Sequence, residues 1–175
     1  KNSKPVVVTG AMRPPTGLGT DADVNLMDCI RVAASGESVG RGVLTVLNNE
    51  IQASRDVTKT NSYRLETFKS YELGCLGYAD SDGEVVFYRT PTKTHTKETE
   101  FNISGIDQLP RVDIAYAYSG ADDIVIKSLV DAGVKGIIAA GLGSGGSPSA
   151  FMSGLNDANN AGVKVVIATQ TGNGR

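Results

Sequence analysis

Residues 5–14 read P-V-V-V-T-G-A-M-R-P, and this stretch begins the unit that decides the fold. Its three consecutive valines are typical of a strand that is buried on both faces of a parallel sheet. A loop rich in Pro and Gly follows, and Asp21 is placed to cap a helix that begins near Ala22. A second buried strand is expected over residues 43–47. These segments predict a β-loop-α-β unit with a right-handed crossover.

The same alternation returns in the second half of the chain. Strands are expected over residues 112–118, 137–140 and 163–168, with helices beginning near Asp122 and Ser149. Alternating strands and helices predict an α/β fold with largely parallel sheets and flanking helices. The sequence thus indicates two units of one class.

Between these units the pattern changes. Residues 48–70 are polar and irregular, and the turn D-S-D-G at residues 80–83 lies between two apolar runs and predicts a β-hairpin. Residues 90–100 are rich in Thr, Lys and Glu, which favours a linker over residues 91–111. The chain begins directly before a strand and ends in a turn, so we interpret it as part of a longer protein.

The composition excludes several classes of partner. The net charge is −2 and there is no Trp, so a nucleic-acid partner is not expected. No apolar run approaches the roughly 18 residues that cross a membrane. Cys29 and Cys75 form no disulfide framework, and we interpret them as small buried apolar residues.

Candidate chemistry lies in loops that leave the carboxyl ends of strands, where sites collect in α/β sheets. The most polar of these loops is R-D-V-T-K-T-N at residues 55–61. Lys59, held among hydroxyls and a carboxylate, could shuttle a proton if burial lowers its pKa. The alternative is that this loop is an ordinary solvated turn.

The Gly-rich loop and the single histidine are weaker candidates for a functional site. The loop G-L-G-S-G-G at residues 141–146 matches the letters of a dinucleotide-binding motif, but it lacks a following Lys-Ser/Thr pair and an acidic residue about 20 positions on. A nucleotide-binding domain is therefore the weakest reading. His95 is the only histidine and lies in the predicted linker, so we expect a surface residue and no metal site.

Several stretches resemble bacterial asparaginases of the type II kind. Residues 5–14 resemble the family text K-P-V-V-x-x-G-A-M-R-P, and residues 41–51 resemble R-G-V-L-V-x-x-N-D-E-I. Residues 55–61 are close to the family's own wording, and similar matches continue at residues 109–116 and 136–141.

The resemblance implies hydrolysis of L-asparagine to L-aspartate and ammonia, with some action on L-glutamine, by a Thr nucleophile and without a cofactor. Lys59 falls on the family's proton-handling Lys. Ala11 falls on the residue whose carbonyl lines the substrate pocket. Gly146, with Ser147 beside it, stands where the family's Gly-rich loop carries an Asn or Ser into a neighbouring subunit's active site.

The family's T-G-G-T-I and H-G-T-D-T motifs, which carry the nucleophile and its partners, do not occur in this sequence and would precede it. The resemblance therefore implies that residues 1–90 are the remainder of an N-terminal α/β domain and residues 112–175 the first part of a C-terminal one. It also implies a homotetramer built from dimers and a periplasmic or secreted location. Lys59 is expected beside groups from the absent part. The alternative is a non-catalytic remnant that only associates or binds a small ligand.

Overall fold

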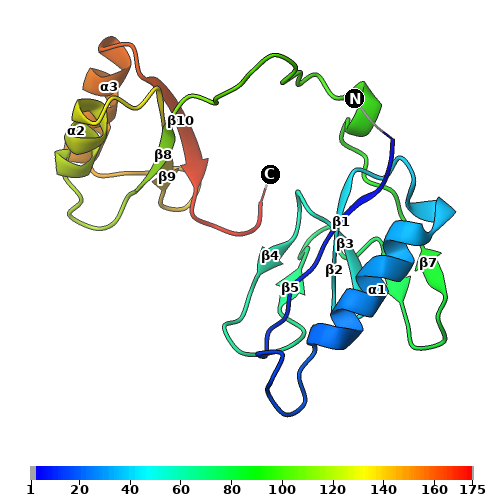
Figure 1. Cartoon of the computed structure of the whole chain (residues 1–175). Coiled ribbons are helices and arrows are strands. Elements are labelled where there is room, and N and C mark those ends of the chain that lie inside the picture. Colours follow the sequence, from blue (N-terminus) through cyan, green and yellow to red (C-terminus); the bar gives the residue numbers. More distant parts are fainter. Residues whose placement is uncertain (1–2, 175) are drawn as a thin grey trace. The chain divides into compact units, whose positions relative to one another are not determined.

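The computed structural model describes residues 3–174. The chain divides into two compact units, Lys1–Asn102 (unit 1) and Ile103–Arg175 (unit 2) (Figure 1). The first unit includes residues 91–102, which the sequence assigns to a linker. This segment contains the short 3-10 helix η2 (Thr96–Glu98). Each unit has its own apolar core, so each is described by itself.

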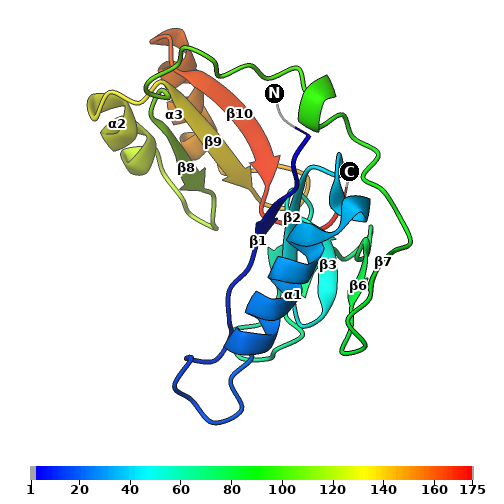
Figure 2. The ribbon, with the colours of Figure 1, turned by 45° about the vertical axis from the view of Figure 1, so that its right-hand side comes forward.

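The sheet of unit 1 has the strand order β1-β2-β3-β6-β7. The bounds are β1 (Val6–Val8), β2 (Val43–Leu47), β3 (Glu50–Ala53), β6 (Gly77–Ala79) and β7 (Val85–Phe87). The helix α1 (Ala22–Ala34) connects β1 to β2 and packs against both strands (Figure 2). The 3-10 helix η1 (Gly36–Ser38) follows α1. Val32 of α1 meets Leu44 and Val46 of β2 in the buried core.

The α/β class is confirmed, but the largely parallel arrangement holds for only part of unit 1. Strands β1 and β2 are parallel, with Val7 opposite Leu44, whereas β3, β6 and β7 are joined by antiparallel pairings. The cause is a two-residue turn between β2 and β3. Asn48 and Asn49 have φ angles of 52° and 63°, the left-handed values that a tight hairpin requires. The hairpin predicted around residues 80–83 is confirmed as β6–β7.

A separate two-stranded ribbon pairs β4 (Thr58–Lys59) with β5 (Phe68–Lys69), placing Lys59 opposite Phe68. The sequence predicts an irregular region here, so this ribbon differs from the expectation. Its two strands are too short for a periodic pattern to reveal them.

In unit 2 the sheet is parallel, as the sequence predicts, and its strand order is β10-β9-β8. Its elements are β8 (Val112–Tyr116), α2 (Ile124–Asp131), β9 (Gly136–Gly141), α3 (Ser149–Asn160) and β10 (Lys164–Thr169). The two helices pack against each other beside the sheet (Figure 1). Their contact depends on Gly154 of α3, because a Cβ there would lie 2.6 Å from the Cβ of Asp123.

Unit 2 buries one face of its sheet more than the other. Ala115 of β8 is buried, but its neighbours Ile114 and Tyr116 are 58% and 62% exposed. Ile114 is aligned through Ile138 with Val166 of β10, which is also exposed. Alternate residues of a strand point to opposite faces, so these side chains form one apolar face. Within residues 3–174, no helix is both long and apolar enough to cross a membrane.

Candidate active site

The loop after β1 is held by side chains from the start of α1. Asp21 occupies the N-cap position, as the sequence predicts, but its carboxylate makes no capping bond to the helix. It accepts hydrogen bonds from the backbone N–H groups of Met12 and Arg13, each at 2.9 Å. Burial works to raise the pKa of Asp21, but these bonds and the Asn25 amide outweigh it and lower the pKa. The residues around Ala11 are thereby fixed, while Ala11 itself is exposed.

Asn25 joins this loop to the neighbouring turn. Its side chain is buried, and the amide nitrogen donates to the Gly10 carbonyl at 2.9 Å and to the Asp21 carboxylate at 2.8 Å. Its oxygen accepts from the backbone N–H of Asn48 at 2.9 Å. One side chain therefore links the carboxyl ends of β1 and β2. The sequence signal for this role is the spacing of four residues between Asp21 and Asn25, which places both on one face of the helix start.

The β4–β5 ribbon, which carries Lys59, is anchored to β3 by polar contacts. The ammonium group of Lys69 lies 2.8 Å from the Glu50 carboxylate, which raises the pKa of Lys69. The Ser70 hydroxyl donates to the side-chain oxygen of Gln52 at 2.8 Å. These contacts hold β5, and β4 is held by its pairing with β5.

Thr67 closes the loop between β4 and β5. This side chain is fully buried, and its hydroxyl both donates to the Asn61 carbonyl and accepts from the Asn61 N–H, each at 2.6 Å. Asn61 in turn accepts from the backbone N–H groups of Tyr63 and Arg64. A cavity of about 680 Å³ lies at this loop. Its lining residues are Arg13, Asn48, Asn61, Ser62, Tyr63, Arg64, Leu65 and Glu66.

This cavity brings together the three loops that leave β1, β2 and β4, but neither Ala11 nor Lys59 lines it. The Lys59 side chain is exposed, and its ammonium nitrogen lies 6.0 Å from the centre of the Phe68 ring. The burial expected for Lys59 is therefore not provided by the residues described, and its catalytic role stays a prediction.

The Gly-rich loop of unit 2 folds back on itself after β9. The backbones of Leu142 and Gly146 exchange hydrogen bonds of 2.7 Å. A Cβ at Gly141 would overlap the backbone of Gly145, so this return requires glycine. Gly146 is exposed, while the Ser147 hydroxyl is buried and, among residues 3–174, makes no hydrogen bond. Gly146 and Ser147 belong to unit 2, whereas Ala11 and Lys59 belong to unit 1.

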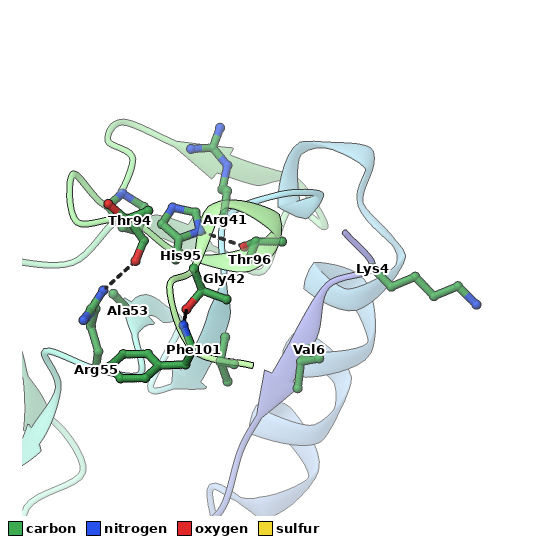
Figure 3. A pocket seen from close by; sticks show the side chains of 13 residues that line it. Lys4, Val6, Arg41, Gly42, Ala53, Arg55, Thr94, His95, Thr96 and Phe101 are labelled. Carbon is green, nitrogen blue, oxygen red and sulfur yellow. Dashed lines mark hydrogen bonds between the residues drawn. The ribbon is translucent and has the colours of Figure 1, made fainter. Parts of the chain in front are cut away.

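A second cavity in unit 1, of about 330 Å³, contains the only histidine (Figure 3). His95 is half-buried rather than a free surface residue, and its Nδ1 lies 2.7 Å from the Thr96 hydroxyl. Figure 3 shows Lys4 and Arg41 with their charged ends directed away from this cavity. Among the described residues, no group of His, Cys, Asp and Glu side chains is arranged to hold a metal ion.

The fold and these loops define an α/β protein with polar side chains gathered in the loops that follow β1, β2 and β4. Residues 1–93 match the family model described as "Asparaginase, N-terminal", and residues 111–175 match the "Glutaminase/Asparaginase C-terminal domain". The chain belongs to the asparaginase family.

Individual relatives agree with this membership. The chain is 43% identical over 174 residues to L-asparaginase 2 of Bacillus subtilis, covering 99% of this chain and 46% of the relative. It is 42% identical to L-asparaginase 2 of Escherichia coli, covering 99% of this chain and 50% of the relative. The chain thus spans about half the length of these relatives.

A solved structure is also similar. It is the probable cytoplasmic L-asparaginase of Campylobacter jejuni, with a TM-score of 0.92 and 37% identity, covering 98% of this chain and 55% of that one. This similarity corrects the expectation of a periplasmic or secreted protein, because a protein described as cytoplasmic shares the fold and much of the sequence.

Proposed function

We propose that the full-length protein is an amide hydrolase that converts L-asparagine to L-aspartate and ammonia, and that it also accepts L-glutamine. The observation that carries this proposal is the match to relatives named L-asparaginase over 99% of the chain. A relative from Pseudomonas fluorescens biotype A is named a glutaminase-asparaginase, which supports action on both amides.

The nucleophile in this proposal is a Thr supplied by polypeptide outside this chain. A Thr hydroxyl is a weak nucleophile at neutral pH, so it requires a group that removes its proton. Lys59 is proposed for this proton-handling group, together with a Thr and an Asp from the same outside polypeptide. The Ala11 carbonyl is proposed to accept a hydrogen bond from the substrate. No cofactor is required for this chemistry.

We further propose that residues 1–90 and 112–175 are parts of an N-terminal and a C-terminal α/β domain, joined by residues 91–111. The full-length protein would assemble as a homotetramer built from dimers, with Gly146 and Ser147 reaching a neighbouring subunit's site. Sedimentation of the full-length protein would measure the mass of the assembly, and a monomer would contradict this part of the proposal.

The activity itself is tested by ammonia release. Purified full-length protein is incubated with L-asparagine, L-glutamine and, as a control, L-aspartate, which has no side-chain amide to hydrolyse. We expect ammonia from the first two substrates only. If neither amide releases ammonia, the alternative of a non-catalytic member of the family is favoured, and binding of L-aspartate by calorimetry would then separate a small-ligand-binding protein from one that only associates.

A further inference from the structure

The Asp21 carboxylate is used in an unusual way for a residue at a helix N-cap. Such side chains commonly accept from the N–H groups of their own helix. Asp21 instead accepts from Met12 at 2.9 and 3.1 Å and from Arg13 at 2.9 Å. The first N–H of α1, that of Ala22, donates to the Thr20 hydroxyl at 3.1 Å. Asp21 therefore acts on the loop that precedes the helix.

This contact fixes the direction of the Ala11 carbonyl. The Met12 N–H and the Ala11 C=O belong to one planar peptide group. No cis peptide bond occurs among residues 3–174, so the two bonds point in opposite directions. Because Asp21 holds the N–H end, the Ala11 oxygen is directed away from Asp21 and cannot turn without breaking that hydrogen bond.

Asn25 secures the preceding peptide group. It donates to the Gly10 carbonyl, whose peptide partner is the N–H of Ala11. It also donates to Asp21 itself, and so fixes the carboxylate. With Asp21 on the next two peptide groups, three consecutive peptides around Ala11 are held by two side chains. Asn25 is 1% exposed, so this bonding is shielded from competition with water.

The charge of Asp21 has a second effect. A hydrogen bond to an ionised acceptor is roughly twice as strong as a neutral one, and it polarises the peptide group that donates it. Electron density is thereby shifted toward the carbonyl oxygen at the other end. The lowered pKa of Asp21 keeps the carboxylate ionised at neutral pH.

We propose that Asp21, supported by Asn25, is a positioning residue. It fixes the direction of the Ala11 carbonyl and makes its oxygen a stronger hydrogen-bond acceptor for the substrate's side-chain amide nitrogen. This inference rests on the proposed function. The leaving nitrogen gains a proton as it departs as ammonia, so its N–H groups become stronger donors in the transition state. A fixed acceptor at this point stabilises the transition state more than the bound substrate.

The test compares two substrates on the full-length protein. L-Asparagine can donate from its side chain, whereas the β-methyl ester of L-aspartate has no N–H at the leaving group. The variant Asp21→Asn keeps the size of the side chain and removes its charge. The matched control is Asp23→Asn, which alters an exposed carboxylate of the same helix.

We expect Asp21→Asn to lower kcat/KM for asparagine by about 10- to 100-fold, the range for a lost hydrogen bond to a charged group. Its effect on the ester should be within about threefold, because the ester makes no use of the Ala11 acceptor. Asp23→Asn should leave both substrates unchanged. An equal loss on both substrates by Asp21→Asn, or no loss on either, would overturn the proposal.

Hydrogen exchange separates a failure of this inference from a failure of the proposed function. The Met12 and Arg13 amides should exchange slowly in the wild-type full-length protein and faster in Asp21→Asn. Equal exchange in the two proteins would contradict the contact itself. A third outcome is that the wild type hydrolyses neither L-asparagine nor L-glutamine while the Met12 and Arg13 N–H groups remain protected from exchange. In that case the proposed function fails and the positioning role fails with it, although the contact between Asp21 and the loop stands.

Discussion

At the scale of single residues, Lys59 is the one on which the proposed chemistry depends most. Its side chain is exposed in the residues described, with the Phe68 ring 6.0 Å from the ammonium nitrogen. It therefore contributes little to packing, and its proposed role requires groups supplied by other polypeptide. A residue of this kind can be changed without disturbing the fold.

We predict that Lys59→Met in the full-length protein lowers kcat for asparagine by about 100-fold or more, since proton transfer by a positioned side chain contributes about 10²- to 10⁴-fold. The melting temperature should change little, because substitutions at exposed positions usually have small effects on stability. Ammonia release and thermal unfolding measure the two quantities. Lys97→Met, at another exposed lysine, is the control. Unchanged turnover in Lys59→Met would refute the role.

Asp28 gives a prediction on pH dependence. Asp28 is 1% exposed, and its carboxylate lies 3.2 Å from the Arg31 guanidinium. Burial raises the pKa of Asp28, and the Arg31 guanidinium offsets this only in part. The folded protein therefore binds more protons than the unfolded chain above the ordinary value of 3.8, so this group destabilises the fold as pH rises through that window.

Asp28→Asn cannot titrate and should remove this contribution. We predict that the variant becomes more stable relative to wild type as pH rises from 3.8 through the raised pKa. Its free energy of unfolding minus that of wild type should therefore increase over this pH range. Urea unfolding of the full-length protein at a series of pH values measures this slope. The lost partner of Arg31 adds a constant offset that does not affect the slope. A parallel pH dependence in both proteins would contradict the assignment.

At the scale of elements, the loop between β4 and β5 depends on one hydroxyl. Thr67→Val keeps the shape of the side chain but removes both hydrogen bonds to the Asn61 backbone. We predict a loss of about 1–3 kcal/mol in the free energy of unfolding, the range for a buried polar group left without a partner. Urea unfolding checks the value. Thr67→Ser, which retains the hydroxyl, should keep most of the stability that Thr67→Val loses. No loss in Thr67→Val together with a loss in Thr67→Ser would indicate that the methyl group matters and the hydroxyl does not.

The elements that sequence reasoning finds are those with apolar runs. Strands β1, β2, β8, β9 and β10 are each marked by Val, Ile or Ala residues, and the helices by regular apolar spacing. Strand β3 was missed because the turn before it uses Asn48 and Asn49 rather than the Asn-Gly pair that identifies a tight hairpin. Its buried Gln52 also interrupts the apolar pattern. The parallel expectation failed in unit 1 for this reason.

The candidate site was predicted less fully than the fold. Residue types identify Lys59 and the loops at strand ends, but the contacts of Asp21, Asn25 and Thr67 depend on three-dimensional proximity. Asp21 illustrates the limit, because its N-cap position follows from local sequence, whereas its bonds to Met12 and Arg13 depend on the path of the loop.

At the scale of the whole molecule, each unit exposes apolar side chains in contiguous sets. In unit 1, β1 is an edge strand with Val6 and Val8 exposed, and α1 exposes Val24, Met27 and Ile30. In unit 2, the face with Ile114, Tyr116 and Val166 is similar. Open strand edges and apolar faces of this kind promote association.

We predict that the polypeptide of residues 1–175, produced alone, is inactive on asparagine and aggregates, because these surfaces are uncovered and the nucleophile is proposed to lie elsewhere. Light scattering and ammonia release, run beside the full-length protein at equal concentration, measure both properties. A soluble monomer that melts cooperatively would contradict the first expectation, and ammonia release would contradict the second.

The glycine at position 154 has a consequence for the order in which unit 2 folds. Glycine inside a helix costs about 1 kcal/mol relative to alanine, and a helix as short as α3 is marginal in water even with better residues. The same glycine admits Asp123 at close range. The segment is thus unstable as an isolated helix and becomes stable only when it packs against α2. We therefore expect α3 to form when it contacts α2, and the two helices to fold and unfold in a single cooperative step.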